Sequence, residues 1–208
     1  MSTETAPRRW DPVVRLTHWS IVLAVLANAV FTEEGSAAHI WVGYALAAIL
    51  ALRLLWGFVG PAEARFTAFP PSPGRALAHL RDIRAGTITR HGSHNPLGAL
   101  MVYAIWSCLL VIIGTGIAMA GIPGSGGKLD ARAITAAGPA TALQAEDGAG
   151  DEGRGAEGEE REEGPLVEVH EVAANLLYLL ILLHIAGVVF ETRRSGRQVV
   201  LAMLPFRR

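Results

Sequence analysis

The sequence of 208 residues contains one cysteine and little charge. The single cysteine, Cys108, excludes an intramolecular disulfide and a cysteine-based metal cluster, and it is expected to be a small packed side chain. The chain also has no phosphate-binding loop, metal-hydrolase motif or catalytic nucleophile motif, and no nucleic-acid partner is expected. Asp, Glu, Lys and Arg make up 18% of the residues and 51% are hydrophobic. This balance is too apolar for an ordinary soluble domain and indicates a membrane protein.

Four apolar segments approach or reach the roughly 20 residues that cross a bilayer core. They predict spans at about 16–34, 37–60, 96–121 and 168–190. The polar start, MSTETAPRRWDPVVR, has no cleavage site behind a short apolar core, so the first span is expected to be retained. Asn95 followed by Pro96 predicts the start of the third helix. The predicted fold is all-α, an integral membrane four-helix bundle that forms a single domain over residues 1–208.

Basic residues are distributed very unevenly between the segments that flank the spans. Thirteen arginines belong to the N-terminus, to residues 61–95 and to the C-terminus, whereas residues 122–167 carry only four basic residues. Because Lys and Arg are enriched on the cytoplasmic side, both termini are predicted to be cytoplasmic. Residues 61–95, which are Pro-rich and amphipathic, are predicted to be a cytoplasmic connection at the membrane surface.

Residues 122–167 are predicted to be a flexible acidic periplasmic loop. The segment is rich in Gly, Ala and Glu, with ten acidic against four basic residues, and it has almost no large apolar side chain. Such a composition cannot bury a core. Two interpretations remain open, a solvated linker and an acidic docking surface for a positively charged periplasmic partner.

Four histidines lie on three of the apolar segments, where an imidazole is costly and usually functional. Helix direction puts His18 and His184 toward the cytoplasmic side and His39 and His170 toward the opposite side. From His170 to His184 the helix rises about 21 Å and turns by only about 40°, so both lie on one face. The pattern predicts a lower pair, His18 with His184, and an upper pair, His39 with His170. Each pair is predicted to hold one haem inside the bundle. Two axial imidazoles leave no open position on the haem iron, which favours electron transfer.

Arg53 is the one basic residue inside a predicted span. It has two interpretations: a side chain that snorkels to the headgroups, or a contact to a haem propionate or a quinone near the lower pair. His94, just before the third span, is a further candidate for a propionate or quinone contact. His79 and His91 are expected to be surface residues of the same connection.

Four stretches carry a family resemblance: WDPVVRLTHWSIVLA, HIWVGYALAAILALRLLWGFVGP, SHNPLGALMV and HEVAANLLYLLILLHIAGV. They resemble the bacterial cytochrome b561 family, which includes the b-type cytochrome subunit of nickel–iron hydrogenases. The resemblance implies a four-helix bundle of the bacterial inner membrane that binds two haems b, with axial iron ligands at His18, His39, His170 and His184. It also implies electron exchange between a quinone pool and a redox protein, hydrogenase-like or cytochrome c-like. The long acidic connection departs from the short loop expected of the family.

The predicted function is therefore a dihaem b-type cytochrome that transfers electrons across the inner membrane between quinone and a redox partner protein. Its residues would place and tune the cofactors, which carry the redox chemistry themselves, so it is not a classical enzyme. One alternative is a haem-free membrane anchor or scaffold that recruits a periplasmic protein. Another is a stand-alone quinol oxidase that reduces a small acceptor.

Overall fold

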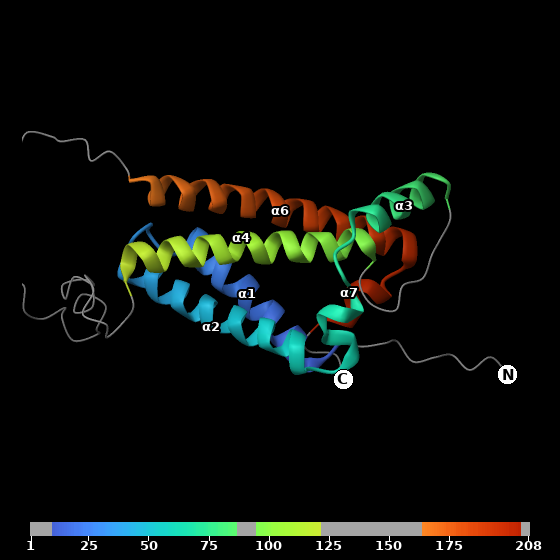
Figure 1. The fold of residues 1–208 in the computed structure, drawn as a ribbon, viewed down its shortest axis with the longest axis horizontal. Helices are drawn as coiled ribbons and strands as arrows, with labels where there is room; N and C mark the ends of the chain where they lie inside the picture. Colours follow the sequence, from blue (N-terminus) through green and yellow to red (C-terminus); the bar gives the residue numbers. More distant parts are fainter. Residues whose placement is uncertain (1–9, 87–94, 122–163, 205–208) are drawn as a thin grey trace, which may run out of the picture.

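The computed structural model describes residues 10–86, 95–121 and 164–204. Its four long helices are α1 (Pro12–Val30), α2 (Ala37–Val59), α4 (Pro96–Ala120) and α6 (Pro165–Ser195). All four are long and apolar enough to cross a membrane. α1 packs along α2, and α4 lies between α2 and the antiparallel α6 (Figure 1). The predicted all-α fold is confirmed for the residues described here, and the four helices identify a multi-pass membrane protein.

The start of α1 is set by a cap rather than by its hydrophobic run. The Asp11 carboxylate accepts hydrogen bonds from the backbone N–H groups of Val13 (2.9 Å) and Val14 (3.1 Å), and Pro12 takes the first helical position. These contacts satisfy backbone donors that a helix start leaves unpaired. The helix therefore begins before the predicted span at 16–34 and ends sooner, at residue 30. The Trp56 indole N–H also donates to Asp11, which ties the start of α1 to the end of α2.

The α4 start agrees with the sequence prediction, and the α6 start does not. Asn95 Oδ1 accepts from the Gly98 N–H at 2.7 Å, with Pro96 at the first helical position. α6 begins at Pro165, so residues 165–167, predicted to belong to the acidic loop, form its first turn. Pro165 favours the first helical position of α6 as strongly as Pro96 does in α4. The prediction missed it because the loop was assigned from its acidic composition. The rest of the predicted loop, 122–163, lies outside the described residues.

The connection after α2 folds back onto the bundle. It contains two short 3₁₀ turns, Ala62–Ala64 and Phe66–Ala68, and the helix α3 (Pro73–Arg84), which lies against α4 (Figure 1). The ring of Phe66 lies 5.7 Å from that of Trp106 on α4. His79 was predicted to be a surface residue, and this is wrong: it is only 4% exposed. It shares the inward face of α3 with Ala76, one turn earlier, so the amphipathic helix buries it against the bundle.

The segment after α6 returns to the start of α1 at the same end of the molecule (Figure 1). α7 (Gln198–Met203) follows α6, and the Trp19 indole N–H donates to the Met203 carbonyl at 2.9 Å. The Arg15 guanidinium donates to the Leu204 carbonyl at 3.1 Å. These bonds join the two ends of the described chain.

A narrow apolar core runs between the four helices. Leu50 of α2 and Leu109 of α4 are its fully buried members. Cys108 is buried beside them and donates its thiol to the Ala173 carbonyl of α6 at 3.0 Å, so it is a packed side chain as predicted. Large apolar side chains elsewhere on the helices point outward: Leu23 (65% exposed), Phe58 (71%) and Leu182 (64%). Helices that are apolar on their outer faces too are typical of proteins that face lipid.

Candidate cofactor sites

The structure brings the four histidines together as two facing pairs, each joining α6 to a different helix. In the lower pair, the ring centroids of His18 (α1) and His184 (α6) are 6.4 Å apart, with ring planes at 52°. In the upper pair, the centroids of His39 (α2) and His170 (α6) are 6.2 Å apart, with planes at 60°. The two separations are nearly equal, although the pairs lie at different depths of the bundle.

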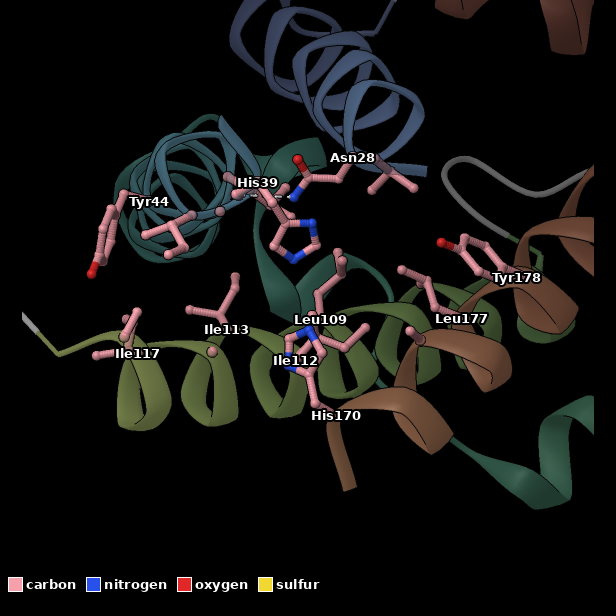
Figure 2. Close-up of a pocket in the computed structure, with 17 residues that line it drawn as sticks. Asn28, His39, Tyr44, Leu109, Ile112, Ile113, Ile117, His170, Leu177 and Tyr178 are labelled. Atoms are coloured by element: carbon pink, nitrogen blue, oxygen red, sulfur yellow. Dashed lines mark hydrogen bonds between the residues drawn. The ribbon is translucent and has the colours of Figure 1, made fainter. Parts of the chain in front are cut away.

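The upper pair points into a cavity between α1, α2, α4 and α6 (Figure 2). The cavity is partly open to the surface, and the empty space within it and at its mouth amounts to about 750 Å³. Asn28 lies at its rim and donates to the His39 backbone carbonyl at 3.2 Å. Tyr44 turns toward the end of α4, where its hydroxyl donates to the Gly121 carbonyl at 2.6 Å. The remaining lining is mainly aliphatic: Val25, Ile40, Leu46, Leu109, Ile112, Ile113, Ile117, Ala120, Ala174 and Leu177.

Each upper imidazole has a threonine hydroxyl beside its Nδ1 atom. Thr115 Oγ1 of α4 lies 2.8 Å from His170 Nδ1. Thr32 Oγ1, just after α1, lies 3.5 Å from His39 Nδ1, at the limit of a hydrogen bond. When Nδ1 is engaged in this way, Nε2 is the ring nitrogen left to contact a ligand.

The lower pair has a different environment. His18 Nδ1 is buried without a hydrogen-bond partner among the described residues. The ring packs edge-on against Trp19, with centroids 5.6 Å apart. The neighbouring Thr17 directs its hydroxyl to its own helix, to the Val13 carbonyl at 2.8 Å. Its hydroxyl therefore does not support the imidazole as Thr115 does.

Arg53 is buried at the depth of the lower pair. It lies fourteen residues beyond His39 on α2, as His184 lies fourteen residues beyond His170 on α6, and the two helices run in the same direction (Figure 1). Its side chain is 5% exposed, and the guanidinium carbon lies 4.9 Å from the centroid of the Trp106 ring. Arg53 Nη1 is buried with no hydrogen-bond partner in the described part of the chain.

The snorkelling interpretation of Arg53 requires the charge to reach the surface, and the structure holds it against an aromatic ring inside the bundle instead. A buried guanidinium with an unpaired N–H favours an anionic or carbonyl oxygen as its partner. His94, the other candidate for such a contact, lies outside the described residues.

The residues of both pairs fit a metal held in a macrocycle. Two metal–imidazole bonds of about 2 Å each, together with the ring radii, separate the centroids by about 6 Å. Within residues 10–86, 95–121 and 164–204, no three His, Cys, Asp or Glu side chains cluster as a site for a bare metal ion. Two imidazoles alone suit haem iron, whose other four positions are filled by the porphyrin.

Two glycines on the wall of the upper cavity leave room for a flat ring. A Cβ atom added to Gly43 would meet nothing within 4 Å. A Cβ added to Gly116 would lie 3.4 Å from His170 Cε1, in van der Waals contact with the imidazole. The open space at Gly43 shows that protein side chains do not fill the cavity on this side.

Helical membrane bundles that hold facing imidazoles in their interior are typical of membrane cytochromes. The chain belongs to the prokaryotic cytochrome b561 family, whose model matches residues 9–206. It is accordingly a haem-binding membrane cytochrome of the b type that takes part in electron transport. No curated protein and no solved structure matches the chain.

Sequence reasoning missed the threonines and the glycines of the upper site. A threonine in an apolar helix usually bonds to its own backbone, so Thr115 carries no signal in the sequence. Gly43 follows His39 by four residues and therefore lies on the same helix face, which is a signal that could have been read. The Asp11 cap was also detectable, because aspartate followed by proline is a typical helix start.

Proposed function

We propose that the chain is a dihaem cytochrome b that transfers electrons across the bacterial inner membrane between a quinone pool and a redox partner protein. The observation that carries this proposal is the pair of facing imidazoles at each of two depths. Membership in a cytochrome family favours this function over a haem-free anchor.

The four histidines would be the axial ligands, His18 and His184 for the lower haem and His39 and His170 for the upper haem. A bound haem would supply reversible one-electron chemistry, and the two imidazoles of each pair would hold its iron. α6 provides one ligand to each site, with the ligands about 21 Å apart along the helix. In a hydrocarbon core of about 30 Å, such sites belong to opposite halves of the bilayer.

We assign to Arg53 the role of binding a haem propionate at the lower site. Its burial supports this role, and so does its Nη1 atom, which has no hydrogen-bond partner among the described residues. The Asp11 carboxylate acts on the charge of Arg53, but a buried N–H group still needs an acceptor of its own. A quinone headgroup is the alternative partner for the same N–H. His94 belongs to the same hypothesis on sequence grounds alone.

The orientation follows from the distribution of arginine. Cytoplasmic termini put the lower site near the cytoplasm and the upper site near the periplasm. The acidic segment 122–163 would then lie on the periplasmic side, where its charge suits a basic partner protein. One site would exchange electrons with quinone and the other with the partner.

The haem content of the purified full-length protein tests the proposal. A pyridine haemochrome assay should give two haems b per chain, both with the spectra of low-spin iron. One haem per chain would contradict the two-site arrangement, and the absence of haem would favour the haem-free membrane anchor. Purification in mild detergent adds a second test, because quinol oxidation without any bound or required protein partner would indicate a stand-alone quinol oxidase.

A further inference from the structure

Thr115 lies where α4 reaches the upper imidazole of α6. Its Oγ1 atom has three polar neighbours: His170 Nδ1 at 2.8 Å, the Val111 carbonyl at 2.8 Å and the Ile112 carbonyl at 3.1 Å. Both the threonine and the histidine are half-buried. The contact between Oγ1 and Nδ1 has the length of an ordinary hydrogen bond.

The number of protons available decides the direction of that hydrogen bond. A hydroxyl has one proton to donate, and a carbonyl can only accept. If the Thr115 hydroxyl donated to Nδ1, its lone pairs would face two carbonyl oxygens at 2.8 and 3.1 Å. If it donates to Val111 instead, its oxygen is free to accept a proton from His170 Nδ1. The second arrangement places a proton in both 2.8 Å contacts and leaves only the longer contact, to the Ile112 carbonyl, without one.

We propose that Thr115 is a positioning residue that holds His170 in the tautomer with its proton on Nδ1. Nε2 then keeps its lone pair and points toward the site. The inference rests on the proposed role of His170 as an axial ligand of the upper haem. A hydrogen bond from Nδ1–H makes the imidazole a stronger donor to a metal. Stronger donation stabilises oxidised iron, so Thr115 lowers the midpoint potential of the upper haem.

Thr32 repeats this arrangement at the other upper ligand in a weaker form. Its hydroxyl donates to the Asn28 carbonyl at 3.1 Å, and its oxygen lies 3.5 Å from His39 Nδ1. Because a hydrogen bond of this length is weak, the effect of Thr32 on the upper haem is smaller than that of Thr115.

Redox titration and low-temperature EPR of the full-length protein in lipid test the inference. Thr115→Val, which keeps the shape and removes the hydroxyl, is expected to raise the midpoint potential of the upper haem and to shift its low-spin EPR signal. Retention of that haem should fall by up to about 10- to 100-fold, as is typical when a group that supports a metal ligand is lost. The lower haem should be unaffected. Thr115→Ser should restore the potential, the signal and the retention.

Thr192→Val is the matched control, because the Thr192 hydroxyl of α6 donates to its own helix, at the Val188 carbonyl (2.6 Å). It should change neither haem. An unchanged upper haem in Thr115→Val would overturn the inference and leave the proposed function intact. If Thr115→Ser behaves like the valine variant, the methyl group matters rather than the hydroxyl, and the inference is again wrong. If His170→Ala retains both haems, the ligand assignment itself fails, which separates the two outcomes.

Discussion

The two histidine pairs have almost the same distance between their imidazole rings, but the polar groups around the rings differ. The upper imidazoles, 6.2 Å apart, have neutral hydroxyls at their Nδ1 atoms and lie in an aliphatic cavity. The lower imidazoles, 6.4 Å apart, include one whose Nδ1 atom has no hydrogen-bond partner in the described part of the chain, and they lie at the depth of a buried arginine. The two proposed haems would therefore be held with the same spacing in two different electrostatic environments.

This difference predicts an order of redox potentials. A nearby positive charge favours the reduced form of iron, because reduction adds an electron. Donation from Nδ1–H to a hydroxyl favours the oxidised form. The lower haem should consequently have the higher midpoint potential, and an electron should move favourably from the upper site to the lower site. A titration that gives the lower haem the lower potential would contradict this comparison.

The largest expected effect is the loss of one haem when a ligand is removed. His184→Ala and His18→Ala should each remove the lower haem and leave the upper one, because a single imidazole cannot replace the missing axial bond. His39→Ala and His170→Ala should each remove the upper haem. Reduced-minus-oxidised spectra of the four variants measure this directly. A spectrum of His18→Ala that matches His39→Ala would show that the pairing is wrong.

Filling the upper cavity should have nearly as large an effect, confined to the upper site. Gly43→Leu places a side chain in open space, so we expect the protein to insert normally and to lose the upper haem through steric exclusion. Gly43→Ala, which adds only a methyl group, is the control and should retain it. Haem quantification and the spectrum of the remaining haem give the result. Retention of both haems in the leucine variant would mean that the ring does not occupy this cavity.

Neutralisation of Arg53 should affect only the lower site. Arg53→Gln is expected to lower the midpoint potential of the lower haem, because it removes a positive charge whose Coulomb interaction favours the reduced iron. Arg53→Lys keeps the positive charge, so the midpoint potential of the lower haem should fall less than in Arg53→Gln. Redox titration of both haems measures the effect. If the potentials stay the same and the apparent affinity for quinol falls, Arg53 contacts quinone rather than a propionate.

The smallest expected effect concerns the acidic segment. Deletion of residues 145–163 should slow electron transfer to or from a basic partner protein by removing most of the acidic charge. Both haems and their reduction by quinol should be unchanged. The difference from the wild type should shrink at high salt, since the Debye length at physiological ionic strength is only about 8 Å. Partner-linked transfer that survives the deletion at low salt would identify the segment as a spacer.

The sequence was sufficient to predict the helices and the facing histidines, because they follow from the length of the apolar runs and from the regular rise and rotation of a helix. Apolar runs indicate where hydrocarbon surrounds the chain, and the rise per residue orders the histidines by depth. It was insufficient for Thr115, whose contact with His170 depends on how two helices pack. It was also misleading for His79, because a polar residue on an amphipathic surface helix can face either the solvent or the bundle. The helix starts at Pro12 and Pro165 were missed, because the predicted spans followed hydrophobicity and not the capping signals.

The hydrogen bonds from Arg15 and Trp19 to the carbonyls of Leu204 and Met203, called the clasp below, have a consequence for biosynthesis. Trp19, next to the lower ligand His18, donates to a backbone carbonyl of α7, the helix that directly follows α6. Synthesis proceeds from α1 to α7, so this clasp can close only after all four spans have been made. Both proposed sites take a ligand from α6, so neither can be complete before α6 has been made. Only the lower site also lies beside a contact that needs α7, so we expect the lower site to be completed last, when α7 packs against the start of α1.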